Sequence, residues 1–149
     1  MPEQAPSGHE LIARALQRSR HWLNVAWEDF PTNRAAESPG GQAKSCDEIL
    51  RHIGGCDLWM LECSHLDPKE APVQHEQMEA ASGEALFGLL GELRTYVEGR
   101  IGQLSGDDLL REPGGYPYPT CIDLWIYAAE HEFWHAGQVQ ALALLFQDR

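Results

Sequence analysis

Residues 120–146 read TCIDLWIYAAEHEFWHAGQVQALALLF, and this stretch decides the fold. Thr120, with Asp123 three residues later, is suited to begin a helix. A helix over these residues is about 40 Å long, since each residue adds about 1.5 Å. Residues three and four positions apart share one helix face, which we predict to point inward. That face carries Leu124, Ala128, His131, His135, Gln138, Leu142 and Leu145.

Two capping boxes mark the beginnings of two further helices. In Ser7-x-x-Glu10 and in Ser45-x-x-Glu48, the hydroxyl and the carboxylate each satisfy a free backbone N–H. The first of these helices ends at Pro31, which cannot continue it. Its inward face reads Ile12, Leu16, Ser19, Leu23, Ala26 and Phe30, and that of the second reads Ile49, His52, Cys56, Trp59 and Cys63.

A fourth helix is predicted near residues 82–104, although five glycines weaken it. Its inward face carries Leu86, Leu90, Leu93, Val97, Ile101 and Leu104. The segments between the four helices are rich in proline and glycine and are predicted to be loops. Four amphipathic helices in one small domain predict an all-α four-helix bundle that takes in residues 1–149. The loops are long enough to cross over, so the pattern leaves the topology open.

The composition excludes several classes of partner. With 23 acidic and 11 basic residues the formal net charge is −12, which disfavours nucleic acids and anionic membrane surfaces. No apolar run approaches the roughly 20 residues of a membrane helix. The start, Met1-Pro2-Glu3-Gln4, has no features of a secretion signal, and the four cysteines form no C-x-x-C pair. We therefore expect a cytoplasmic protein.

Three histidines lie on predicted inward faces, where leucine would be expected. His131 and His135 are four residues apart on one helix, and His52 lies on another. A buried imidazole without a partner is costly, whereas side chains at i and i+4 are neighbours that can bind one ion. The sequence therefore predicts a divalent metal site on His52, His131 and His135. The other four histidines are His9, His21, His65 and His75.

Several neighbours of these histidines have two interpretations. Gln138 either orients a ligand ring or forms hydrogen bonds within the core. Glu132 is either a general base or a solvated or dimer-facing carboxylate. Cys56, one turn from His52, is either a fourth ligand or a small apolar filler, and we favour the filler. Trp59 is the tryptophan expected to wall a pocket.

Two other metal-site classes match parts of the sequence. His131-Glu132-x-x-His135 has the H-E-x-x-H pattern of zinc peptidases. Such enzymes usually take a third ligand downstream, and the only acid after His135 is Asp148, so a peptidase is disfavoured. A di-metal carboxylate bundle needs two E-x-x-H pairs and further glutamates. The pair Glu62/His65 flanks its helix face, so this class is disfavoured too.

The pattern of His52 on one helix, followed by H-x-x-x-H-x-G-Q at residues 131–138, resembles the DinB-like (DinB/YfiT) metal-binding bundles. The resemblance covers essentially the whole chain in length and helix order. It implies an up-down-down-up bundle, a homodimer, and one divalent ion, commonly nickel or zinc. The ligands that it implies are His52, His131 and His135, with water in the open positions. Some relatives are transferases or isomerases that use a low-molecular-weight thiol.

Three neutral imidazoles would leave a bound ion with its full charge and with open positions. Such an ion lowers the pKa of bound water or thiol and polarises a carbonyl. We therefore expect a metal-dependent enzyme that acts on small molecules, either a thiol-dependent transferase or a hydrolase. The alternative is a metal-binding stress or sensor protein without catalysis. The choice between zinc and nickel stays open because imidazole suits both.

Overall fold

The computed structural model describes residues 5–147, and within this range the chain is all-α, without a strand. The Met1–Gln4 start and Asp148, both considered above, lie outside the described residues. Two short 3₁₀ turns, at Thr32–Arg34 and Pro68–Glu70, lie in the connecting segments. The helices are α1 (Gly8–Glu28), α2 (Cys46–Cys63), α3 (His75–Ala80), α4 (Gly83–Gln103), α5 (Gly106–Leu110) and α6 (Cys121–Gln147).

The predicted helix beginnings are confirmed. The amide of Glu10 donates to Ser7 Oγ at 3.3 Å, and the amide of Ser7 donates to the Glu10 carboxylate at 2.7 Å. The same reciprocal pair joins Ser45 and Glu48, at 3.2 and 2.7 Å. Each box satisfies two backbone N–H groups that have no partner within the helix.

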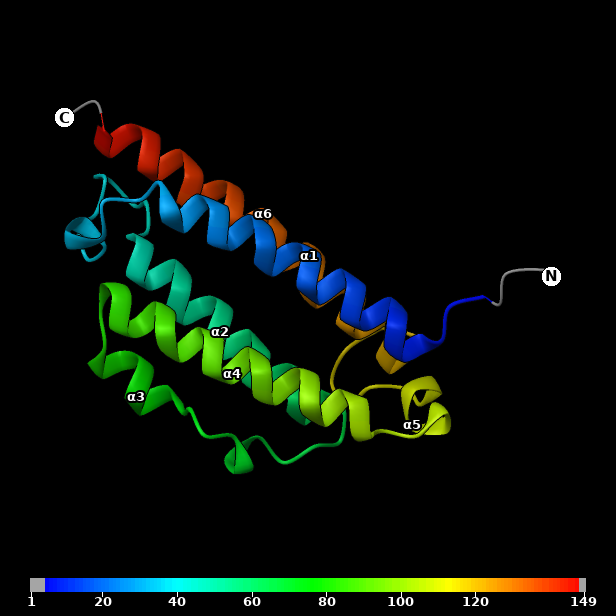
Figure 1. Cartoon of the computed structure of the whole chain (residues 1–149). Helices are drawn as coiled ribbons and strands as arrows, with labels where there is room; N and C mark the ends of the chain where they lie inside the picture. The colour runs from blue at the N-terminus through cyan, green and yellow to red at the C-terminus, as the bar shows by residue number, and fades with distance from the viewer. Residues whose placement is uncertain (1–4, 148–149) are drawn as a thin grey trace.

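The four long helices pack side by side as a helical bundle (Figure 1). Helix α6 runs along α1 and also contacts α2, while α2 packs against α4. The bundle core contains large side chains from all four of these helices. Fully buried examples are Leu16, Leu50, Leu93 and Trp125. This packing fixes α2 and α6 as neighbours, and these two helices carry the three predicted ligands.

Two of the predicted loops contain short helices. The segment between α2 and α4 includes α3 and passes along the outside of the bundle (Figure 1). The segment between α4 and α6 includes α5, whose first turn is capped by Ser105 and Asp108. Helices of five or six residues show too little periodicity to stand out from a proline- and glycine-rich background.

The inward face is predicted correctly for α1 and almost completely for α4, where only Leu104 is half-buried. The prediction for α2 is wrong at three positions, because His52 and Trp59 are exposed and Cys56 is half-buried. The buried face of α2 is rotated to the side that carries Leu50, Ile53, Asp57 and Leu61. On α6, Leu145 is exposed to 37%. Among the described residues, no helix has the length and apolar character needed to cross a membrane.

Candidate metal centre

The three predicted ligand rings lie together at the edge of the bundle. His131 Nε2 lies 3.1 Å from His52 Nε2 and 3.1 Å from His135 Nε2. The ring centroids of His52 and His135 are 4.9 Å apart. The prediction of a dry, buried seam is wrong for His52, which faces solvent, whereas His131 is half-buried and His135 is buried. The cluster is therefore accessible from outside the protein.

A hydrogen bond fixes the orientation of the His135 ring. Its Nδ1 lies 2.7 Å from Oε1 of Gln138, three residues further along α6. An amide oxygen can only accept, so Nδ1 carries the hydrogen and Nε2 of the neutral ring keeps its lone pair. That lone pair belongs to the nitrogen that lies beside His131. The arrangement is the one that a metal-binding imidazole requires.

The nitrogen separations fit a shared ion. Bonds of about 2.0–2.1 Å at angles of about 90–109° place neighbouring donor atoms about 2.8–3.4 Å apart. Both separations at His131 Nε2, 3.1 Å, fall in this range, whereas the three residues whose donor atoms all lie within 4.8 Å of one another are His52, Cys56 and His131, without His135. Three ring nitrogens also cannot all be satisfied by one another, because a single hydrogen at His131 must serve both contacts. A cation accepts all three lone pairs.

Cys56 adds a fourth donor atom to the cluster. Its Sγ lies 3.8 Å from His52 Nε2, and one donor atom each from His52, Cys56 and His131 all lie within 4.8 Å of one another. These three residues can hold a metal ion. The interpretation of Cys56 as an apolar filler is therefore incomplete, since the thiol lies among the imidazoles.

The environment keeps the rings neutral and the thiol protonated in the absence of a metal. Burial, together with His135 and His52, lowers the pKa of His131 to about 4. Burial also lowers the pKa values of His52 and His135. Burial and the charge of Asp57 raise the pKa of Cys56 to about 11. Neutral imidazole is the form that binds metals.

An aromatic cluster lies beside the histidines. The Tyr127 ring is 5.9 Å from that of His131, and Tyr116 and Tyr118 stack at 5.0 Å and contact Tyr127. Trp59 packs edge-on against Tyr116 at 4.9 Å and also lines a cleft beside His52. The expectation that Trp59 walls a pocket is confirmed. The segment that carries the tyrosines at positions 116 and 118 lies next to the cluster.

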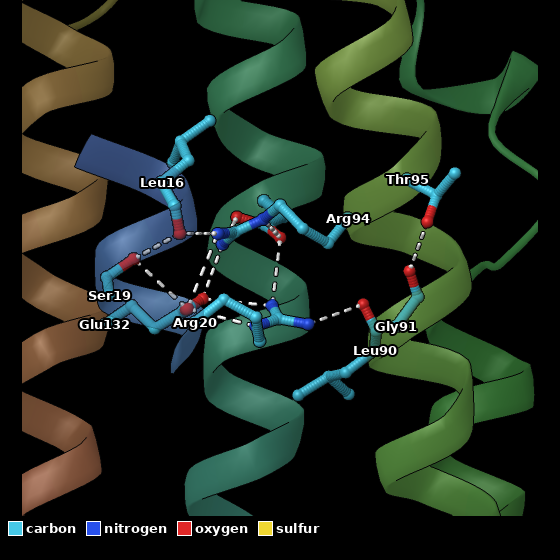
Figure 2. A network of polar contacts seen from close by, with 9 residues as sticks. Leu16, Ser19, Arg20, Leu90, Gly91, Arg94, Thr95 and Glu132 are labelled. Atoms are coloured by element: carbon cyan, nitrogen blue, oxygen red, sulfur yellow. Dashed lines mark hydrogen bonds and ion pairs between the residues drawn. The ribbon is translucent and has the colours of Figure 1, made fainter. Parts of the chain in front are cut away.

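Four charged side chains form a buried network within the bundle, and Figure 2 shows three of them, Arg20, Arg94 and Glu132. Arg20 of α1 donates two hydrogen bonds of 3.0 Å to the Glu132 carboxylate, and Ser19 donates a third at 3.2 Å. Arg94 of α4 also donates to Glu132, and it pairs with Asp57 of α2 at 3.0 and 3.2 Å. The network therefore contains two arginines and two carboxyl groups, so that cationic and acidic side chains are equal in number.

The network determines the charge state of Glu132. Burial acts to raise the pKa of this carboxyl, but Arg94 and Arg20 outweigh burial and hold the pKa below its usual value. The interpretation of Glu132 as a solvated or dimer-facing residue is wrong, because it is 1% exposed. Its carboxylate is bound by two arginines, which leaves it poorly suited to act as a general base.

One feature of the sequence indicates this network. Arg94 lies four residues after Leu90 and three before Val97, and therefore on the apolar face of α4. A long cation on a buried face requires a buried anion. Asp57 and Glu132 each follow a residue of the histidine cluster in the chain, Cys56 and His131, and so point about 100° further around their helices, into the core.

The second E-x-x-H pair does not join the cluster. His65 Nε2 lies 3.0 Å from the backbone oxygen of Glu112, beyond the end of α2, and both Glu62 and His65 are exposed. His9 Nε2 lies 2.8 Å from the backbone oxygen of Leu104. Neither histidine contributes a donor atom to the candidate site.

Two clefts meet at His52. One, of about 630 Å³, is lined by α2 and α3 and includes Cys56, Trp59 and His75. The other, of about 770 Å³, lies between the segment that precedes α2 and the outer side of α6, and includes Trp134 and His135. Both volumes suit a small molecule rather than a folded partner.

Comparison of the chain with family models, with curated proteins and with solved structures gives no match.

Proposed function

We propose that the chain binds one divalent metal ion through His52, His131 and His135 and uses it to transform a small molecule. The proposed reaction class is a thiol-dependent transfer or a hydrolysis. The observation that carries the proposal is the position of His131 Nε2, which lies 3.1 Å from the Nε2 atoms of both His52 and His135. Zinc and nickel are both candidates, since neutral imidazole suits either ion.

The ion would supply a Lewis-acid centre that activates water or a thiol at neutral pH. The protein's part is to hold and orient. Gln138 fixes the ring of His135 through Nδ1, so that Nε2 keeps its lone pair on the side of His131. His52 borders both clefts, so a small molecule can reach the cluster from solvent. Glu132 stays with Arg20 and Arg94, which is why we do not propose a peptidase.

The resemblance to DinB-like bundles belongs to the same proposal, together with the up-down-down-up topology. The passage of the segment between α2 and α4 along the outside of the bundle supports that topology (Figure 1). A homodimer and a low-molecular-weight thiol as co-substrate stay predictions, as does a location in the cytoplasm. Exposed apolar side chains on α1 and α6, such as Trp22 at 46% and Phe133 at 54%, support an interface between two copies.

The direct test is metal analysis of purified protein beside the His131→Ala variant, with His75→Ala as a matched control. His131 Nε2 lies 3.1 Å from the Nε2 atoms of both other ligands, whereas His75 lines the same cleft as His52 and is not one of the proposed ligands. We expect about one ion per chain in the wild type and in His75→Ala. Stoichiometric metal retained by His131→Ala would remove the proposed site.

A second candidate function, metal binding without catalysis, is favoured by the Cys56 thiol at 3.8 Å from His52 Nε2. A fourth protein ligand closes the coordination shell, as in structural sites. Cobalt(II) substitution distinguishes the two functions, since a bound thiolate gives an intense charge-transfer band in the near ultraviolet. If the protein is an enzyme, the cobalt-substituted protein should lack this band, and the metal-loaded protein should turn over a thiol, ester or epoxide substrate. A band that is lost in Cys56→Ser, with no turnover across such a panel, would favour the second function.

A further inference from the structure

The larger of the two clefts at His52 has an unusual lining for a strongly acidic protein. Its walls are apolar, with Trp134 and Leu142 from α6 and Ile49 from α2. The polar groups are the imidazoles of His52 and His135, two glutamine amides and the ammonium group of Lys44. Among residues 5–147, no carboxylate lines this cleft, although the chain carries 23 acidic residues.

No carboxylate of residues 5–147 lies within ion-pair distance of Lys44, although the charge of Lys44 also helps to lower the pKa of Glu48. The nearby Glu48 accepts its hydrogen bond from the backbone amide of Ser45, at 2.7 Å, as part of the α2 cap. Lys44 lines the larger cleft together with His52 and His135. The cation is therefore available to an anion in the cleft.

The backbone before α2 holds Lys44 in this place. Gly40 and Gly41 have φ values of 115° and 63°, which L side chains rarely adopt. The turn that they form is closed by a hydrogen bond from the amide of Ala43 to the oxygen of Gly40, at 3.3 Å. Ser38 Oγ donates to the oxygen of Ala43 at 3.1 Å. These contacts fold the segment against the cleft beside the histidines.

The smaller cleft has the opposite character. Lys44 and Arg51 share it with Glu48 and Glu79, and Arg51 lies 3.8 Å from Glu79. The two cations and the two carboxylates of this cleft are equal in number, so it offers no net preference for an anion. Of the two clefts, the larger one is therefore better suited to bind a small anion, because it combines apolar walls with a single cationic side chain.

We propose that the cleft of about 770 Å³ binds a small monoanionic molecule, with an apolar or aromatic body against Trp134 and Leu142 and a carboxylate on Lys44. The volume matches that of small-molecule sites, which run from about 300 to 1,000 Å³. Trp134 is 63% exposed and offers an open apolar face for such a body. As a statement about the substrate, this inference rests on the proposed function, because His52 and His135 form one end of the cleft. The binding itself does not need the ion.

The test compares three probes of the same shape: 3-phenylpropionate, 3-phenylpropionamide and 3-phenylpropylamine. Dissociation constants are measured by calorimetry on the full chain, both metal-loaded and after treatment with a chelator. In the chelated protein we expect the carboxylate to bind at least about 10-fold more tightly than the amide, and the amine to bind most weakly. The Lys44→Gln variant should lose the preference of carboxylate over amide, and Trp134→Ala should weaken both.

The matched control is Lys69→Gln, which removes an exposed lysine outside both clefts. It should retain the wild-type preference. Equal binding of carboxylate and amide by the chelated wild type would overturn the inference, and so would a preference that survives in Lys44→Gln. Failure of the metal site leaves this result unchanged, because the decisive comparison is made without metal. Conversely, a confirmed metal site with no carboxylate preference removes only the inference about the substrate.

Discussion

At the scale of single residues, Gln138 explains how one imidazole is prepared for a metal. The 2.7 Å contact between its Oε1 and His135 Nδ1 determines which ring nitrogen carries the hydrogen. An alanine at position 138 leaves the ring free to rotate and to exchange tautomers. The polar residue on an otherwise apolar stretch of α6 is thus accounted for by its partner, not by the core.

We expect Gln138→Ala to weaken metal binding by about 10- to 100-fold, as is usual when the group that orients a ligand is removed. The measurement is a competition titration with a chromophoric chelator at constant pH. Gln140→Ala, two residues further along the same helix and half-buried, is the control and should bind as the wild type does. Equal weakening in both variants would mean that the loss comes from the helix and not from the hydrogen bond.

The sequence predicts part of this site well and part of it poorly. The spacing of His131 and His135 predicts their approach, because i and i+4 side chains always lie near each other on a helix. The approach of His52 depends on how α2 is rotated, and its predicted burial is wrong. The Asp57–Arg94–Glu132 network involves three helices, and periodicity within one helix contains no information about partners on another.

At the scale of elements, the buried charges connect all four long helices. Arg20 of α1, Asp57 of α2, Arg94 of α4 and Glu132 of α6 are joined by ion pairs, with side-chain exposures of 12% or less. On both α2 and α6, a network residue directly follows a residue of the histidine cluster. The network therefore fixes the rotation of the two helices that carry the ligands.

We expect Arg94→Met to lower the free energy of unfolding by about 3–5 kcal/mol, because it leaves two carboxylates buried without this partner. Chemical denaturation followed by circular dichroism measures the change. Arg100→Met is the control, since its ion pair with Glu70 lies at the surface and is expected to contribute little to stability.

Should Arg94→Met fail to fold, Glu132→Gln provides a milder change, since the amide oxygen can still accept from Arg20 and Ser19. A loss of stability for Arg94→Met no larger than for Arg100→Met would show that the network contributes little to the fold.

The elements themselves are predictable to different degrees. Both serine–glutamate capping boxes are confirmed. A capping box is predictable because it forms between residues only three positions apart in the sequence. Helices α3 and α5 were missed, since each is short and is held by contacts with other parts of the chain, such as the burial of Met78 in α3 and Leu109 in α5. The buried face of α2 differs from the predicted one because it includes Asp57, a charged residue whose partner Arg94 lies on another helix.

At the scale of the whole molecule, metal binding should stabilise the fold, because its ligands come from two helices. A ligand at 100 times its dissociation constant adds about 2.7 kcal/mol to stability. For a chain of 149 residues, this corresponds to a rise of roughly 5–10 °C in Tm. Differential scanning calorimetry before and after chelation measures it.

The His131→Ala variant should show no such rise, while its own Tm in chelator stays close to that of the wild type. A rise of the same size in His131→Ala would place the stabilising ion elsewhere on this acidic surface. No rise in the wild type would mean that the cluster does not bind the added metal in the folded state.

The central claim is that three imidazole nitrogens of this bundle hold one cation. Crystals of zinc-loaded protein, with diffraction data collected on both sides of the zinc absorption edge, test it most directly. The account predicts one strong anomalous peak about 2.0–2.1 Å from the Nε2 atoms of His52, His131 and His135. The absence of a peak among these three nitrogens, in crystals that contain zinc elsewhere, would contradict it.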